Sequence, residues 1–156
     1  MRKLSIQVTD MPGTRDAERL IEAITLAYQQ LSQISDDLHL ARGITTGMRS
    51  VLLMLDQGGD QTVPALANQR CVSRQFLHRL TCTLQEGGWV AFRDNPRHRR
   101  SPLVTLTEQG HQEIADIRRL EAPLLESFVQ SQDDDAIALA AKVVVDLCRQ
   151  GAASRT

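Results

Sequence analysis

Aromatic residues, cysteine, lysine and long apolar runs are all scarce in this sequence. Only 3% of its 156 residues are aromatic, so any core must be mainly aliphatic. Three cysteines are too few, and odd in number, for a disulfide framework, which favours a reducing compartment. The apolar run Val51–Leu55 falls far short of the ~20 residues that span a bilayer, and the N-terminus lacks a signal peptide's apolar stretch. We therefore expect a cytoplasmic, globular protein without membrane spans.

The residue patterns of enzymes and metal sites are also missing. The four histidines are scattered, and no set of histidine, cysteine and acidic residues has the spacing of metal ligands. The sequence contains no glycine-rich phosphate loop and no nucleophile with a paired base. We therefore expect a protein that is not an enzyme and that uses no metal or cofactor.

The net charge of −1 conceals an uneven distribution of charge along the chain. Residues 41–106 hold nine arginines and four acidic residues, whereas acidic residues outnumber basic ones in 1–40 and in 107–156. The basic residues are sixteen arginines and two lysines, and the planar arginine fork suits phosphates and base edges. A basic middle between acidic ends is typical of a nucleic-acid-binding protein with separate scaffolding helices.

The two ends of the chain have the pattern of long amphipathic helices. Apolar residues recur at intervals of three and four from residue 14 to about 41, with Thr14 as the expected cap and Gly43 as the expected stop. Such a helix is roughly 40 Å long, which exceeds what a small core needs. A second helix is expected from Thr107 or Glu108, with Pro123 interrupting or kinking it.

A last helix is expected to begin at Asp133–Asp135 and to end at Gly151. Its apolar residues cover so much of the circumference that burial on several sides is expected. We therefore predict that residues 1–41 and 108–156 form a helical dimerisation region around a DNA-binding domain at residues 42–107.

The middle of the chain has the layout of a helix-turn-helix. Helices are expected over Ile44–Leu55 and Thr62–Asn68, followed by a turn at Gln69–Val72. Ser73 should cap the next helix, which runs to Glu86 and turns Leu77, Leu80 and Leu84 inward. Its outer side carries side chains suited to base edges and phosphates: Ser73, Arg74, Gln75, His78 and Arg79.

Two short strands are expected after this helix, at Trp89–Arg93 and Leu103–Leu106. The loop between them carries Arg97, Arg99 and Arg100, and arginine is suited to contacts in a narrow minor groove. The predicted fold is therefore mainly α with a small β-wing (α+β), which is a winged helix-turn-helix core with additional terminal helices.

Six short motifs, in the correct order, resemble those of the MarR family of winged-helix transcription regulators. They are Ile44-Thr45, the TVPALA of residues 62–67, His78-Arg79, the LQEGG of residues 84–88, the NPRHRR of residues 95–100 and the LTEQG of residues 106–110. The resemblance covers nearly the whole chain. It implies a homodimer that binds a palindromic operator in double-stranded DNA, usually as a repressor that a small phenolic or aromatic ligand or oxidation releases.

The sequence departs from the family pattern at several positions. His98 stands where the family usually has an aspartate that braces the wing arginine. Cys82 and Thr83 stand where Asp-Arg is usual, and Met48 replaces a common glutamine.

The signal that controls the protein has two candidate sites. The resemblance implies a ligand pocket near His39, Arg42 and Arg49. Redox control is the alternative, because Cys71 and Cys82 have arginines nearby and cationic neighbours favour thiol reactivity. A further alternative is a winged-helix module that binds another protein and binds DNA only weakly.

Overall fold

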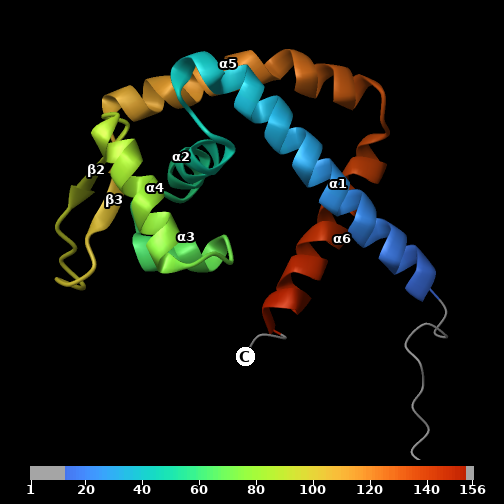
Figure 1. The fold of residues 1–156 in the computed structure, drawn as a ribbon, viewed down its shortest axis with the longest axis horizontal. Helices are drawn as coiled ribbons and strands as arrows, with labels where there is room; N and C mark the ends of the chain where they lie inside the picture. Colours follow the sequence, from blue (N-terminus) through green and yellow to red (C-terminus); the bar gives the residue numbers. More distant parts are fainter. Residues whose placement is uncertain (1–12, 154–156) are drawn as a thin grey trace, which may run out of the picture. The chain divides into compact units, whose positions relative to one another are not determined.

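The computed structural model describes residues 13–153 and divides the chain into two compact units, Met1–Thr46 and Gly47–Thr156 (Figure 1). The first unit contains helix α1 (Thr14–His39) and the 3-10 helix η2 (Leu40–Arg42). Helix α1 confirms the long N-terminal helix, and Gly43 ends η2 at a φ of 67° as expected. The expected cap at Thr14 is wrong, because the N-cap position is occupied by Gly13.

The apolar side of α1 is largely exposed. Leu26, Tyr28 and Leu31 are 55%, 64% and 58% exposed. These residues give α1 an exposed apolar face.

The second unit consists of helices and a small three-stranded sheet. Its elements are α2 (Thr46–Gly58), β1 (Gln61–Thr62), α3 (Val63–Gln69), α4 (Arg74–Glu86), β2 (Val90–Arg93), β3 (Leu103–Leu106), α5 (Glu108–Gln130) and α6 (Asp134–Ala153). The predicted fold class is therefore confirmed. None of the described helices is both long and apolar enough to cross a membrane.

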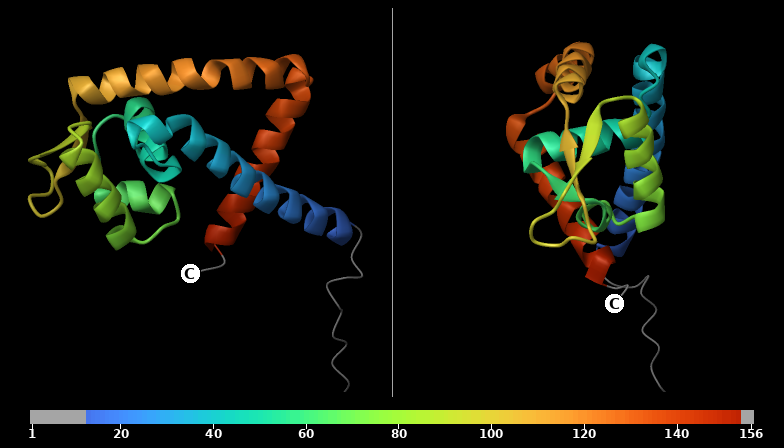
Figure 2. Two further views of the ribbon diagram at one scale, coloured as in Figure 1. Left: turned by 45° about the horizontal axis from the view of Figure 1, so that its top comes forward. Right: turned by 90° about the vertical axis from the view of Figure 1, so that its left-hand side faces the viewer.

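The sheet has the strand order β1-β3-β2 and is antiparallel throughout. In the hairpin, Val90 pairs with Leu106 and Arg93 pairs with Leu103. Strand β1 was not expected from the sequence, because two residues are too short to give a strand pattern. The hairpin starts beside the N-terminus of α5, and its tip points away from that helix (Figures 1 and 2).

The core of the second unit is aliphatic, as the scarcity of aromatic residues implies. Its fully buried side chains come from α2, α3, α4, β2, β3 and α5, and they include Val51, Leu52, Leu66, Leu77, Leu84, Val90, Val104, Ile114 and Ile117. On α4, Leu77 and Leu84 are 0% exposed, which confirms two of the three expected inward residues.

Thr81, and not Leu80, completes the buried face of α4. Thr81 is 0% exposed, whereas Leu80 is half-buried at the edge of that face. On a 3.6-residue helix Leu80 and Thr81 lie about equally far from the direction midway between Leu77 and Leu84, so the packing of neighbouring elements, and not the spacing alone, decides which of them is buried. The Thr81 hydroxyl donates a hydrogen bond to the carbonyl of His78 at 2.9 Å, which satisfies the buried polar group.

The C-terminal helices differ from the expected ones at two positions. Helix α5 continues as one element through Pro123 to Gln130, so the proline does not interrupt it. Helix α6 continues past Gly151 to Ala153, so the expected stop at Gly151 is wrong. Gly151 does not have the positive φ that a helix-ending glycine adopts.

Candidate nucleic-acid interface

Side-chain caps begin both helices of the helix-turn-helix. Thr62 Oγ1 accepts a hydrogen bond from the backbone N–H of Ala65 at 3.3 Å, and this cap begins α3. Ser73 Oγ accepts from the N–H of Phe76 at 3.1 Å and begins α4, as the sequence predicted. Between them, in the turn from α3 to α4, Cys71 adopts a φ of 54°, which is in the left-handed region.

The outer side of α4 displays a polar and basic surface opposite its buried face. Every side chain that the sequence assigned to DNA on this helix is exposed, namely Ser73, Arg74, Gln75, His78 and Arg79. Neither arginine has an ion-pair partner among residues 13–153. Their positive charge is therefore available to an external anion.

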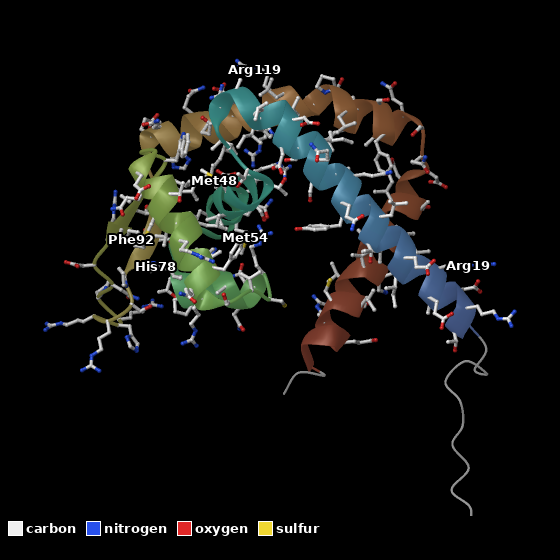
Figure 3. The ribbon with its side chains drawn as sticks, viewed as in Figure 1. Arg19, Met48, Met54, His78, Phe92 and Arg119 are labelled. Carbon is white, nitrogen blue, oxygen red and sulfur yellow. The ribbon has the colours of Figure 1, made fainter. Side chains whose placement is uncertain are left out.

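His78 connects α4 to the wing. Its ring centroid lies 6.4 Å from that of Phe92 on β2, with 30° between the ring planes (Figure 3). Cys82 Sγ, one helical turn further along α4, lies 3.6 Å from His78 Nδ1. The sequence predicted His78 at the surface, but it gave no sign of the contacts with Cys82 and Phe92.

The wing tip is exposed and rich in arginine. Arg97, His98, Arg99 and Arg100 all have exposed side chains, and none of the three arginines has an ion-pair partner within residues 13–153. The tip is held by Asn95, whose side chain bonds both Arg97 N and the carbonyl of Ser101. Sequence reasoning missed Asn95, although an Asn-Pro pair is a known turn signal.

A shallow hollow of about 420 Å³ brings α4 and the wing together. Its lining includes Arg74, Gln75 and His78 from α4 and Arg100 from the wing, over apolar residues that include Phe92. Arg97 lines a separate hollow of about 390 Å³ on the side of β1. The structure thus gathers four of the predicted DNA contacts on one concave surface.

Hydrogen bonds and a close backbone contact join the base of the wing to the start of α5. Thr107 Oγ1 accepts from the N–H of Gly110 at 3.0 Å, which caps α5, and donates to the carbonyl of Gly88 at 2.6 Å. A Cβ added to Gly110 would lie 2.1 Å from the carbonyl oxygen of Trp89, so only glycine fits there. The Leu-Thr-x-x-Gly motif therefore fixes the hairpin against α5.

The residues expected near a ligand pocket have separate surroundings. His39, buried at the end of α1, and Arg42, half-buried in η2, belong to the first unit. Arg49 on α2 belongs to the second, where its Nε and Nη2 both bond the carboxylate of Glu121 on α5. This ion pair gives Arg49 a role in joining two helices, and ligand binding by these residues stays a prediction.

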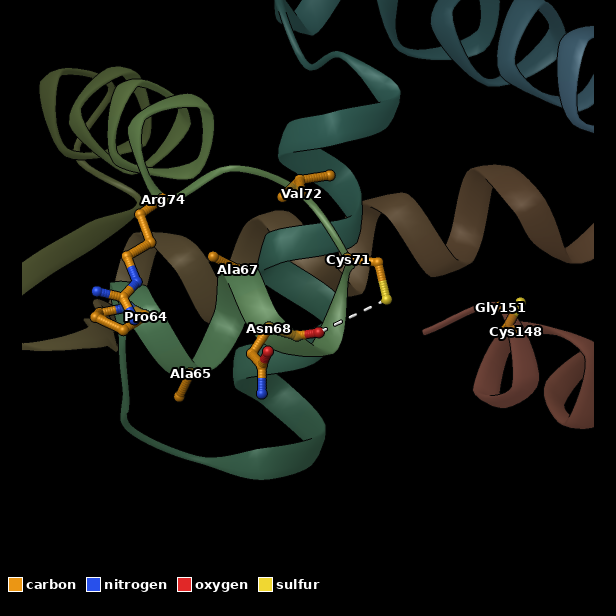
Figure 4. Close-up of a pocket in the computed structure, with 9 residues that line it drawn as sticks. All are labelled: Pro64, Ala65, Ala67, Asn68, Cys71, Val72, Arg74, Cys148 and Gly151. Carbon is orange, nitrogen blue, oxygen red and sulfur yellow. Dashed lines mark hydrogen bonds between the residues drawn. The ribbon is translucent and has the colours of Figure 1, made fainter. Parts of the chain in front are cut away.

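The two candidate redox cysteines have different environments. Cys71 is exposed in the α3–α4 turn, where its thiol lies 3.8 Å from the carbonyl of Asn68 (Figure 4). It lines a hollow of about 850 Å³ together with Cys148 of α6. Cys82 is half-buried beside His78. Within the described residues, no group of three or more histidine, cysteine and acidic side chains could hold a metal ion.

Comparisons with curated proteins give a partial match. No family model matches the chain. Uncharacterized proteins of Mycobacterium tuberculosis and Mycobacterium bovis are 36% identical to it over 83 residues. The match covers 53% of this chain, and the chain spans 58% of the length of those relatives.

Solved structures match over most of the chain. A MarR family transcription regulator is 26% identical, with a TM-score of 0.72 over 92% of this chain and 97% of that one. BldR, a transcriptional regulator from Sulfolobus solfataricus, gives a TM-score of 0.77 at 18% identity, covering 89% of this chain and 99% of its own. A mutant of MarR from E. coli in complex with operator DNA gives 0.72 at 21% identity, covering 85% and 95%. The last two matches show a shared fold.

Proposed function

We propose that this chain is a MarR-like winged-helix regulator that binds double-stranded operator DNA and represses transcription, because it shares its fold and 26% of its aligned residues with a MarR family transcription regulator. The family is not enzymatic. One observation carries the proposal: the concave surface on which Arg74, Gln75 and His78 of α4 meet Arg100 of the wing.

Helix α4 has the properties of a helix that enters the major groove. Its buried face anchors it to the core, so its outer side chains can approach base edges without disturbing the fold. Arginine and glutamine form paired hydrogen bonds with guanine and adenine edges, which makes Arg74 and Gln75 the candidates for base readout. Ser73, His78 and Arg79 would bond phosphates or further base edges on either side.

The wing supplies the second set of contacts. Arg100 faces the same hollow as α4, while Arg97 and Arg99 extend the positive surface along the tip. Arginine is favoured in narrow minor grooves because the negative potential is strongest there. We assign Arg100 to the minor groove or its phosphates, and Arg97 and Arg99 to neighbouring phosphates.

We also propose that the protein is a homodimer that addresses a palindromic operator. Each unit leaves an apolar helix face exposed, on α1 in the first unit and on the C-terminal half of α5 and on α6 in the second. Tyr28, Phe128 and Leu139, for example, are 64%, 51% and 63% exposed. Exposed apolar surface of this extent favours association, and a second copy would place two α4 helices in half-sites about one helical turn apart.

Two signals are candidates for release from the operator. A small aromatic effector is the first, with His39, Arg42 and Arg49 as the candidate contacts. Thiol oxidation is the second, and it is favoured by the 3.6 Å contact between Cys82 and His78. Oxidation of Cys82 would enlarge the side chain beside a histidine of the proposed DNA surface.

The experiment that tests the proposal is selection of bound sequences from a random pool of double-stranded DNA. We expect enrichment of a palindrome, binding by a dimer, and an affinity that falls steeply as salt is raised. Arg100→Ala should weaken binding, whereas Arg119→Ala, which removes an exposed arginine of α5, should not. Weak binding that is independent of sequence and of Arg100 would instead support a module that binds another protein.

The same operator complex distinguishes the two release signals. Aromatic acids and peroxide are added separately to wild type and to Cys82→Ser and Cys71→Ser variants. Release by peroxide that is lost in Cys82→Ser supports the thiol alternative, whereas release by an aromatic acid in all three proteins supports an effector.

A further inference from the structure

The wing tip is organised by one uncharged side chain. Asn95 is half-buried, whereas residues 96–100 after it are exposed. Its Nδ2 donates a hydrogen bond to the carbonyl of Ser101 at 2.9 Å, and its Oδ1 accepts one from the backbone N–H of Arg97 at 3.0 Å. One amide therefore joins the point where the chain leaves β2 to the point where it returns towards β3.

The orientation of this amide is unambiguous. The backbone N–H of Arg97 can only donate, and the carbonyl of Ser101 can only accept. The Asn95 side chain must therefore present its oxygen to Arg97 and its NH₂ group to Ser101. An aspartate at this position can satisfy the first bond and not the second.

We call these two hydrogen bonds of the Asn95 side chain the Asn95 clasp. The backbone between the two bonded groups folds as two successive turns. His98 N donates to the carbonyl of Asn95 at 3.1 Å, and Ser101 N donates to the carbonyl of His98 at 2.9 Å. The last strand pair before the tip is Arg93 with Leu103. No residue from 93 to 103 is fully buried, so hydrogen bonds and not core packing set the shape of the loop.

We propose that Asn95 is the positioning residue of the wing, fixing the backbone from which Arg97 and Arg100 reach DNA. The inference rests on the proposed DNA-binding function. The resemblance implied a carboxylate brace at position 98, where this chain has an exposed histidine. The clasp at Asn95 holds the loop without a negative charge, so it leaves the full positive charge of the arginines available to phosphates.

The test compares Asn95→Ala, Arg100→Ala and the double variant on the selected operator, with Asn68→Ala as the matched control. Asn68 is an exposed asparagine of α3 in the same unit. We expect Asn95→Ala to weaken DNA binding roughly tenfold. The slope of log affinity against log salt concentration should fall by about 1, the value for one phosphate contact. Because Asn95 acts through the wing arginines, its effect should shrink when Arg100 is already alanine.

A second measurement tests the clasp in the protein without DNA. The amide of Arg97 donates to Asn95 Oδ1, so its hydrogen exchange should accelerate in Asn95→Ala and stay unchanged in Asn68→Ala. In Asn95→Asp the Arg97 bond is kept while a carboxylate faces the Ser101 carbonyl. That variant should bind DNA more weakly than Asn95→Ala, since it adds negative charge to the wing.

The outcomes separate this inference from the proposed function. Wild-type binding that depends on Arg100 but is unaffected by Asn95→Ala overturns the positioning role and leaves DNA binding in place. The positioning role is also overturned if the affinity lost in the double variant is the product of the losses in Asn95→Ala and Arg100→Ala. Unchanged exchange at Arg97 overturns the clasp whether or not DNA is bound, whereas selection of no sequence by the wild type overturns the proposed function.

Discussion

Helix α4 and the β2–β3 wing carry the same kind of side chain on the same surface, but they hold it in different ways. Leu77, Thr81 and Leu84 fasten α4 to the core, and each is 0% exposed. The wing tip has no buried side chain between residues 93 and 103, and its shape comes from two turns and the Asn95 clasp. One half of the proposed interface is therefore positioned by packing and the other by hydrogen bonds.

This difference separates stability from binding. A substitution on the buried side of α4 should reduce the free energy of unfolding of the whole unit, because core packing is shared among several elements. A substitution in the wing should change DNA affinity with little effect on unfolding, because few buried contacts are lost.

The largest effect is expected from Leu77→Ala, which removes a fully buried side chain under α4. It should lower the free energy of unfolding by about 3 kcal/mol, through lost burial and the cavity left behind. Urea unfolding at fixed protein concentration measures this value. Phe76→Ala, next to it but 40% exposed, should cost less than about 1 kcal/mol, and equal losses would show that α4 is not anchored by its buried face.

The junction between wing and helix should be nearly as sensitive. Gly110→Ala places a Cβ 2.1 Å from the carbonyl oxygen of Trp89, so the hairpin or the start of α5 must move, at a cost of about 2 kcal/mol. Gly151→Ala is the control, because its Cβ meets no atom of the described residues within 4 Å and the residue lies inside α6. That variant should be more stable by up to about 1 kcal/mol. Destabilisation of similar size in both would show that the close approach is not what restricts residue 110.

The third prediction compares the two halves of the interface through their arginines. Arg74→Ala on α4 should weaken operator binding by about 1–3 kcal/mol and relax the preference for one base of each half-site. Arg100→Ala should lower affinity similarly for all sequences and reduce the salt slope by about 1. Both variants should unfold like the wild type. Repeating the selection with each variant tests this, and a changed base preference in Arg100→Ala alone would reverse the roles assigned to α4 and the wing.

The sequence predicted the elements well where its pattern is strong. The long first helix, the two helices of the helix-turn-helix, the hairpin strands and the cap at Ser73 follow from periodicity and capping chemistry, and the structure has them. Proline and glycine predicted the ends of helices less well. Pro123 lies inside α5 and Gly151 lies inside α6, because a helix can continue through either residue.

The positioning of the candidate site was less predictable. Exposure of the arginines follows from their place opposite an apolar face, but the meeting of Arg100 with Arg74 depends on how the hairpin packs beside α4. The ion pair of Arg49 with Glu121 joins residues that are 72 positions apart, so no local pattern reveals it. The clasp at Asn95 depends on a loop conformation that sequence spacing does not fix.

The smallest expected effect concerns Cys71, in the turn that leads into α4. Its φ of 54° is in the left-handed region, which costs a residue with a side chain about 1–2 kcal/mol and costs glycine much less. Cys71→Gly should therefore raise the free energy of unfolding by roughly 0.5–1 kcal/mol, because relief of strain exceeds the greater freedom of glycine in the unfolded chain. This corresponds to a rise in Tm of about 1–4 °C.

Cys71→Ala is the matched control for this variant, because alanine removes the thiol and its contact with Asn68 but keeps the strained backbone. Only the glycine variant should gain stability, and neither should alter DNA affinity, since α4 remains anchored by its buried face. Equal stabilisation by both substitutions would assign the effect to the thiol. A loss of DNA affinity in the glycine variant alone would show that the strained turn, and not core packing by itself, sets the orientation of α4.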